Sequence, residues 1–344
     1  MRDNILGAET ADGNLPEKIY VEASSRCNLN CLMCFRHSWI DESPGEMELP
    51  LFLKLASEIR EMPSVKEVFF GGMGEPLFNG NICRMLAAVP PHIKKSLITN
   101  GTLLDENMSE RLIESGLDEL WISVDGYSME TYSKIQRGSE FDRICDNIAT
   151  FNRLRKGRNV RLCITFVITS ENEAELDRID DFADRFDIDE INVSHEIPGH
   201  PVEEGYLCGE ERYPLGEMRR LSEGVIGAEE DRCPFIDNNA VFIKWNGDVI
   251  PCMQLLHSCR TYLYDEQRTI TSFSYGNLHE SSLLDCWNRD DYSRFRKRVR
   301  EFYFPFCRHC EGCEDRKQNL TDCFLTESPA CGACLWASGR VFCP

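Results

Sequence analysis

Three cysteines lie within eight residues near the start of the chain, in the segment CNLNCLMCF, at Cys27, Cys31 and Cys34. Thiolates bind zinc, form redox pairs or hold iron–sulfur clusters. Structural zinc sites usually pair two C-x2-C knuckles, and a redox pair needs only two thiols. Three thiolates in one compact loop can hold a [4Fe–4S] cluster whose fourth iron stays open to a small molecule. The spacing favours this open cluster, with zinc as the main alternative.

A glycine-rich loop, GGMGEP, spans residues 71–76 directly after the strand-like segment Val65–Phe70. Glycines let a ligand approach the backbone closely, and backbone carbonyls accept hydrogen bonds from an ammonium group. An isolated loop of this kind is also explained by a tight turn. Its place one strand after the cysteine loop favours a binding role.

Cysteine is unusually frequent, with 18 residues, and eleven of them lie at or after Cys233. Cysteine-rich chains without a secretory signal usually bind metal. The segment CPFIDNNAVFIKWNGDVIPC predicts a hairpin with Asn246 and Gly247 at its turn, which brings Cys233 and Cys252 together. A zinc ribbon built from CRHCEGC and CGAC is the alternative to iron–sulfur clusters here.

The net charge of −20 argues against general binding to nucleic acid or an anionic membrane surface. The chain has no apolar run long enough to span a bilayer, and its first residues lack the apolar core of a signal peptide. The cytoplasm is therefore the expected location.

Short apolar segments alternate with amphipathic ones over the first two hundred residues, which predicts an α/β fold with a parallel sheet. The ends of these strands carry the polar motifs, as ligand-binding ends of parallel sheets do. The expected strands are Lys18–Ala23, Val65–Phe70, Lys95–Thr99, Glu119–Val124, Arg161–Ile168 and Glu190–Ser194. The expected helices are Pro50–Met62, Glu106–Ser115, Phe141–Leu154 and Glu173–Arg185, the last one capped by Asn172.

Changes of composition divide the chain into four parts. We expect an N-terminal tail over 1–16, the α/β domain over 17–205, an acidic bridging segment over 206–232 and a cysteine-rich domain over 233–344. His195 and Glu196 follow the sixth strand and are candidate substrate contacts, although structural hydrogen bonds would also explain them.

The ordered motifs CxxxCxxC, GxGEP, TNG and SxDG resemble those of the radical S-adenosylmethionine (SAM) superfamily. This resemblance implies a partial (βα)6 barrel. It also implies a SAM-binding [4Fe–4S] cluster and reductive cleavage of SAM to a 5′-deoxyadenosyl radical that abstracts hydrogen from a substrate. Cys27, Cys31 and Cys34 would hold the cluster. The methionine amine of SAM would be lined by Gly72, Met73, Gly74 and Glu75. Its carboxylate would be held by Ser123 and Arg137, and its adenine would lie near Val193.

The cysteine-rich domain resembles the SPASM extension of radical SAM proteins, which implies one or two auxiliary [4Fe–4S] clusters. The spacing departs from the usual C-x2-C-x5-C-x3-C in its second half. The candidate ligands are Cys233, Cys252, Cys307, Cys310, Cys313, Cys323, Cys331, Cys334 and Cys343.

The segments PCMQLLH, GNLHESSLLDCW, NLTDCF and CGACLWASGRVFCP resemble one SPASM subgroup, the tungsten cofactor oxidoreductase maturases of anaerobes. The resemblance implies a maturase that acts on a tungsten-containing, aldehyde ferredoxin oxidoreductase-like enzyme or on its pterin cofactor. Reduced ferredoxin or flavodoxin is the expected electron donor.

Two alternatives remain besides a zinc-binding interaction protein. One is a ribosomal-peptide maturase that forms thioether or carbon–carbon crosslinks on a peptide substrate. About 16 residues before the first strand are too few for the leader-binding domain that such maturases usually carry, which counts against it. The other is an iron–sulfur electron carrier or scaffold without SAM chemistry. Such a protein does not need a SAM-binding loop, so the GGMGEP segment argues against it.

Overall fold

The computed structural model describes residues 14–40, 42–200, 232–263, 265–307, 310, 312–339 and 341. The expectations for Cys343, for residues 1–13 of the tail and for residues 206–231 of the bridging segment lie outside these residues.

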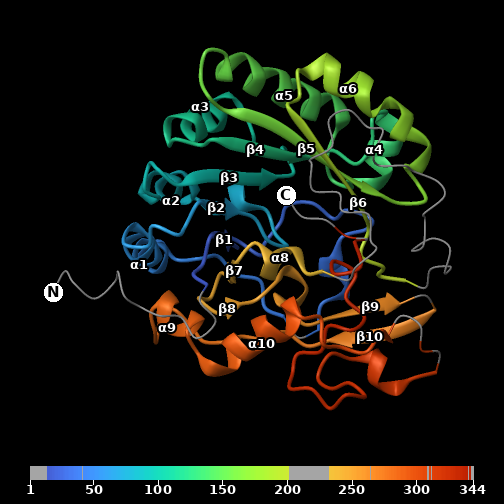
Figure 1. Ribbon diagram of the computed structural model, residues 1–344. Helices are drawn as coiled ribbons and strands as arrows, with labels where there is room; N and C mark the ends of the chain where they lie inside the picture. Colours follow the sequence, from blue (N-terminus) through green and yellow to red (C-terminus); the bar gives the residue numbers. More distant parts are fainter. Residues whose placement is uncertain are drawn as a thin grey trace.

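Six parallel strands form most of the main sheet and run in sequence order from β1 to β6 (Figure 1). Each one pairs in parallel with its predecessor. Because every connection is a crossover, all six carboxyl ends meet at one edge of the sheet. The strands are β1 Lys18–Val21, β2 Glu67–Phe70, β3 Lys94–Thr99, β4 Glu119–Ser123, β5 Arg161–Ile168 and β6 Glu190–His195. The predicted α/β fold with a parallel sheet is confirmed.

Helices fill the crossovers and cover the outer face of the sheet. In the first of them, Leu51, Leu55 and Ile59 recur on one face and are buried, as their spacing predicts. The helices of this part are α1 Leu49–Arg60, α2 Ile82–Ala88, α3 Glu106–Glu114, α4 Met129–Ile135, α5 Phe141–Arg155 and α6 Ile179–Phe186. The short helices α2 and α4 were not predicted, because seven residues give too little periodicity to detect.

The segment after β5 differs from the single helix expected over Glu173–Arg185. A 3-10 helix covers Glu173–Arg178, and α6 begins only at Ile179. Asn172 stands at the N-cap position, but its side chain makes no cap hydrogen bond. Its amide instead donates to the carbonyls of Asp125 (3.0 Å) and Val167 (2.8 Å), so it links the ends of β4 and β5.

The cysteine-rich domain continues the main sheet. Strand β7 (Ala240–Ile243) pairs in parallel with β1, and β8 (Val249–Ile250) returns antiparallel to β7. The predicted hairpin is therefore confirmed, and Gly247 in its turn has φ +91°, a conformation that favours glycine. The pairing of β7 with β1 was not predicted. It fixes the domain against the first strand of the barrel.

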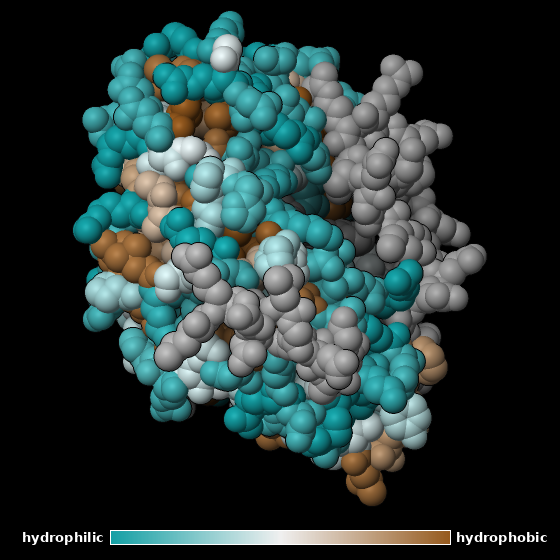
Figure 2. Space-filling view, turned by 60° about the vertical axis from the view of Figure 1, so that its left-hand side comes forward, coloured by the Kyte–Doolittle hydropathy of each residue, from teal (hydrophilic) through white to brown (hydrophobic). Residues whose placement is uncertain are grey.

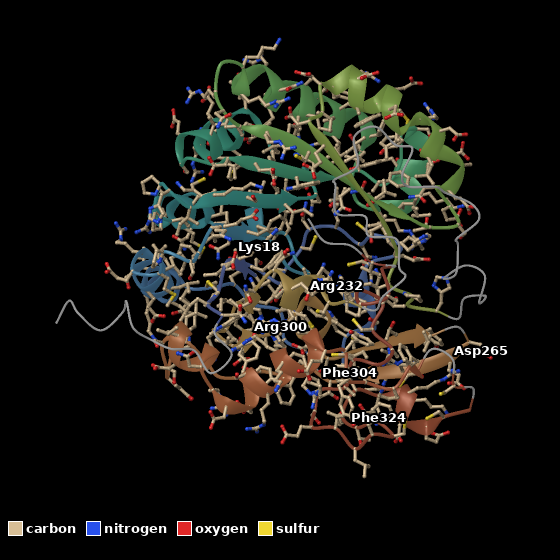
Figure 3. The ribbon with its side chains drawn as sticks, viewed as in Figure 1. Lys18, Arg232, Asp265, Arg300, Phe304 and Phe324 are labelled. Carbon is tan, nitrogen blue, oxygen red and sulfur yellow. The ribbon has the colours of Figure 1, made fainter. Side chains whose placement is uncertain are left out.

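Apart from its first helix, the rest of this domain lies below the sheet in Figure 1. It consists of α8 Pro234–Asp237, the hairpin β9 Cys259–Leu263 and β10 Glu266–Ile270, α9 Leu283–Trp287 and α10 Asp290–Arg300, with short 3-10 turns between them. Long loops follow α10, and Phe304 and Phe324 lie among them (Figure 3). A capping box at Ser282 and Asp285 starts α9.

Outside the residues drawn in grey, the surface seen in Figure 2 is mostly hydrophilic. Within the described parts of the chain, no helix combines the length and apolar composition that a bilayer-spanning segment requires.

Candidate functional site

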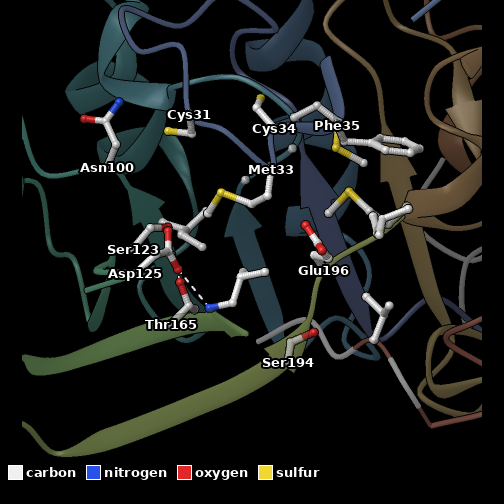
Figure 4. A pocket seen from close by; sticks show the side chains of 18 of the residues that line it. Cys31, Met33, Cys34, Phe35, Asn100, Ser123, Asp125, Thr165, Ser194 and Glu196 are labelled. Carbon is white, nitrogen blue, oxygen red and sulfur yellow. Dashed lines mark hydrogen bonds between the residues drawn. The ribbon is translucent and has the colours of Figure 1, made fainter. Parts of the chain in front are cut away.

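A cavity of about 300 Å³ opens at the carboxyl ends of the parallel strands. Figure 4 shows Cys31 and Cys34 on one side of it, with Ser123, Asp125 and Glu196 across from them. Its walls come from the loops after β1 to β6 and from the C-terminal domain. The fold therefore brings the polar motifs of separate strands together around one space.

All three cysteines of the first loop line this cavity. The backbone N–H of Cys34 donates to the carbonyl of Cys31 (3.1 Å), which makes the loop compact. Two donors reach the Cys27 Sγ atom, the backbone N–H of Leu29 at 3.4 Å and the Asn100 side-chain amide at 3.6 Å. N–H donors of this kind favour the thiolate form that a metal requires.

The thiol pKa values fit a cationic metal group. Burial raises the pKa of Cys31, and the neighbouring charges of Asp125, Cys34 and Cys27 raise it further. Burial likewise raises the pKa of Cys27. Three crowded thiolates repel each other unless a cation lies between them, so the loop is suited to hold a metal cluster.

The glycine loop packs directly on the cysteine loop. A Cβ atom at Gly74 would lie 2.3 Å from the carbonyl oxygen of Ser24 and 2.6 Å from that of Arg26, so only glycine fits there. The backbone N–H of Glu75 donates to the Arg26 carbonyl (2.7 Å). Gly72, Met73, Gly74 and Glu75 all line the cavity.

The Glu75 side chain joins the glycine loop to the end of β3. Its carboxylate accepts hydrogen bonds from the backbone N–H of Leu77 (2.9 Å), the Thr99 hydroxyl (2.8 Å) and the backbone N–H of Asn100 (2.7 Å). Burial raises the pKa of Glu75 to about 7, although these bonds lower it. Both oxygens are engaged by the protein, so the geometry gives this side chain a positioning role.

The SVDG motif ends β4 at the cavity. Ser123 lines the cavity and accepts a hydrogen bond from the Thr165 hydroxyl (3.2 Å). Asp125 was not singled out from the sequence. It is 2 % exposed, lines the cavity and accepts from the backbone N–H of Val167 (2.8 Å). Burial raises its pKa to about 7.

Arg137 does not line the cavity, whereas its neighbour Gln136 does. The Gln136 amide donates to the carbonyl of Ser123 (3.0 Å) and accepts from the backbone N–H of Asp125 (3.0 Å). Arg137 is exposed, and its carbonyl accepts from the backbone N–H of Asn30 in the cysteine loop (3.0 Å).

At the end of β6, His195 and Glu196 line the cavity together with Asn192 and Ser194. Val193 is buried and does not line it, because alternate residues of a strand face opposite sides of the sheet.

Four other cysteines line a second cavity inside the C-terminal domain. Cys233 and Cys252 come from either side of the hairpin, and Cys331 and Cys334 come from the CGAC segment. Burial and the neighbouring Cys334 thiolate together raise the pKa of Cys233 to about 12. The same causes raise the pKa of Cys252 and Cys331.

A third group contains Cys307, Cys310, Cys313 and Cys323. Burial and the three other thiols raise the pKa of Cys307 to about 11, although Arg268 lowers it. Cys310 and Cys323 are exposed, so this group lies at the surface. The structure thus divides the described cysteine candidates into sets of three, four and four.

Trp336 lies between the two cavities and lines both. It is 2 % exposed, and its ring centroid lies 6.3 Å from that of Phe235. Met253 of the PCMQLLH segment also lines the first cavity. Neither residue was identified as a site residue from the sequence, because each reaches the barrel mouth only through the tertiary fold.

The model of the radical SAM superfamily matches residues 21–183. The model of SPASM, an iron–sulfur cluster-binding domain, matches residues 233–314.

Among curated proteins, the chain is 29 % identical to the tungsten-containing aldehyde ferredoxin oxidoreductase cofactor-modifying protein of Pyrococcus furiosus, over 95 % of this chain and 96 % of the relative. It is 23 % identical to the PqqA peptide cyclase of Granulibacter bethesdensis, over 92 % and 87 %. Among solved structures, native anSMEcpe with bound AdoMet and Cp18Cys peptide superimposes with a TM-score of 0.63 at 18 % identity, over 94 % of this chain and 95 % of that one.

Proposed function

The chain belongs to the radical SAM superfamily and carries an SPASM domain, and from this premise we propose that it is a maturase for a tungsten-containing oxidoreductase. The observation that supports this target is the similarity to the Pyrococcus furiosus protein, which extends over 95 % of this chain.

Membership in this superfamily makes the chain an enzyme that uses SAM and a [4Fe–4S] cluster, with auxiliary iron–sulfur clusters in the SPASM domain, as the motifs predicted. When bound, the reduced cluster and SAM supply one-electron cleavage of the sulfonium and abstraction of a hydrogen atom from the substrate. The residues around the first cavity have the chemistry for these groups, because three thiols and a close-packed glycine loop meet there.

In our proposal Cys27, Cys31 and Cys34 hold the SAM-binding cluster. The backbone of residues 72–75 receives the SAM amine, and Glu75 keeps that loop against β3. Ser123 faces the SAM carboxylate. Gln136 fixes the end of β4 by donating a hydrogen bond to the Ser123 carbonyl. Met253 and Trp336 bring the C-terminal domain to the wall of the same cavity.

We assign one auxiliary cluster to Cys233, Cys252, Cys331 and Cys334, and a second to Cys307, Cys310, Cys313 and Cys323. Each set supplies the four thiolates that a closed [4Fe–4S] cluster needs. Cys233 and Cys252 of the first set are buried, whereas Cys310 and Cys323 of the second are exposed, which suits internal and surface-facing roles in electron transfer.

His195 and Glu196 are then the proposed substrate contacts, and the substrate is the oxidoreductase polypeptide or its pterin cofactor. Reduced ferredoxin or flavodoxin is the proposed electron donor, and the cytoplasm is the proposed location. A peptide substrate is the second candidate, because a peptide cyclase is similar over 92 % of this chain.

The test is to purify a tungsten oxidoreductase from the native host with and without this gene. Mass spectrometry is then applied to the polypeptide and to the released cofactor. The proposal predicts a mass difference in one of the two. Identical masses in both, together with a crosslinked small peptide that requires the gene, would instead establish the peptide function.

A further inference from the structure

His257 lies at the junction of three segments that are far apart in the sequence. Its side chain is fully buried, at 0 % exposure. Its Nε2 atom lies 2.8 Å from Glu22 Oε1, and its Nδ1 atom lies 3.1 Å from Glu42 Oε2. Trp39 stacks on the ring at 4.0 Å between centroids. The ring thus contacts the end of β1 and the segment after the cysteine loop, while belonging to the C-terminal domain.

Glu22 connects this histidine to the glycine loop. Its Oε1 atom accepts the backbone N–H of Met73 (3.2 Å) as well as the imidazole. A Cβ atom at Gly72 would lie 2.7 Å from Glu22 Cγ, so the loop rests directly on this side chain. The other oxygen, Oε2, is buried and has no hydrogen-bond partner among the described residues. The imidazole is therefore one of only two described groups that fix the Glu22 carboxylate.

The opposite side of the ring is fixed by the C-terminal domain and Glu42. The Glu42 carboxylate accepts from Lys244 Nζ (2.9 Å) and from the backbone N–H of Ser258 (2.8 Å). Each ring nitrogen of His257 thus faces a carboxylate oxygen, that of Glu22 on one side and that of Glu42 on the other.

We propose that His257 is a positioning residue for the SAM-binding loop: it fixes Glu22 beneath Met73 and thereby makes the SAM amine site depend on the docked C-terminal domain. This inference rests on the proposed function, because it takes residues 72–75 as the amine site. A chain of two hydrogen bonds, from His257 to Glu22 and from Met73 to Glu22, carries the coupling.

The test compares SAM binding to the anaerobically reconstituted full chain and its variants by equilibrium dialysis with labelled SAM. The reduced protein is also followed by EPR before and after SAM is added. The variants are His257→Gln and the isosteric Glu22→Gln, which act on the loop, and Glu42→Gln, which removes charge only on the far side of the ring. His279→Gln makes the same exchange at an exposed histidine of the same domain and serves as the control.

We expect His257→Gln to weaken SAM binding about tenfold or more, the scale of one lost charge-assisted hydrogen bond. We expect Glu22→Gln to weaken it as well, and the double variant to be no weaker than the more affected single variant. Glu42→Gln should change binding less than about threefold. The EPR change that SAM causes should shrink in the first two variants, while iron content stays at the wild-type value.

Unchanged SAM binding in both His257→Gln and Glu22→Gln would overturn the inference. Equal losses in these variants and in Glu42→Gln, accompanied by loss of iron, would also overturn it, because that pattern reports general destabilisation. If His257→Gln does not fold, Glu22→Gln alone decides between these results. A wild-type protein that takes up iron but binds no SAM would contradict the proposed function itself and remove the basis of the inference.

Discussion

Replacing Glu75 by Gln should stabilise the metal-free protein at pH 8. The carboxyl is 1 % exposed, and burial raises its pKa from 4.5 to about 7 despite three hydrogen-bond donors. Glutamine has the same shape and carries no charge at any pH. The substitution therefore removes the cost of burying an ionised group at this position.

The magnitude follows from linkage. The folded-state pKa lies above the unfolded value, so the folded protein binds more protons between pH 4.5 and 7. Stability consequently falls as the pH rises through this window. The difference amounts to roughly 3 kcal/mol at pH 8. An amide nitrogen that faces the Asn100 N–H cannot accept its hydrogen bond, so the gain is reduced by about 1 kcal/mol.

Guanidinium unfolding of metal-free wild type and Glu75→Gln at pH 4 to 8 tests this reasoning. The variant should gain about 2 kcal/mol at pH 8 but lose about 1 kcal/mol at pH 4, where both side chains are neutral. A variant that is less stable at pH 8, or that has the same pH slope as wild type, would refute the burial argument.

Glu67→Gln is a matched control that should destabilise the folded protein, whereas Glu75→Gln should stabilise it. Burial alone would raise the pKa of Glu67, but Lys18 (3.2 Å) and Lys94 (3.5 Å) outweigh it and lower the pKa. The ion pairs therefore stabilise the fold at neutral pH and stop doing so on acidification. This variant should lose about 1 kcal/mol at pH 7 and less as the pH falls through the lowered pKa.

Three further outcomes follow from the site. Cys334→Ala and Cys313→Ala should each lose up to about four irons per chain by elemental analysis, and their double variant about eight; equal iron in single and double variants would contradict two separate clusters. Asn100→Leu removes the amide donor to Cys27 Sγ and should lower the reduction potential of the SAM-binding cluster in an EPR-monitored titration, where an unchanged potential would contradict that role. Asp125 ionises as the pH rises through about 7, so affinity for the cationic SAM should rise there; Asp125→Asn should lose part of this rise, and an identical pH profile would exclude the contribution.

Local patterns were sufficient to predict the parallel sheet and the loop that follows its first strand. Buried strands are recognisable in the sequence as short apolar runs. Because parallel strands end at the same edge of a sheet, Cys27, Gly74 and Ser123 could be predicted to lie close together, as they do in the structure. The comparisons confirm the radical SAM and SPASM resemblance on which the cofactors were predicted. Within one motif the structure places Gln136 in the cavity wall, whereas the resemblance singled out its neighbour Arg137.

Long-range contacts could not be predicted. The division of the C-terminal cysteines into two sets depends on how loops fold back, since Cys331 and Cys334 join Cys233 across almost a hundred residues of sequence. The parallel pairing of β7 with β1 and the burial of His257 against Glu22 are likewise set by docking between domains. The local periodicity of the sequence contains no information about such contacts.

The most direct measurement is the yield of 5′-deoxyadenosine when the anaerobically reconstituted, reduced protein is incubated with SAM. Our account predicts that the wild-type protein forms this product and that the variant with Cys27, Cys31 and Cys34 all replaced by Ala forms none. The Cys334→Ala variant should retain the reaction. A fully iron-loaded wild-type protein that forms no 5′-deoxyadenosine, or a triple variant that forms as much as wild type, would contradict the account.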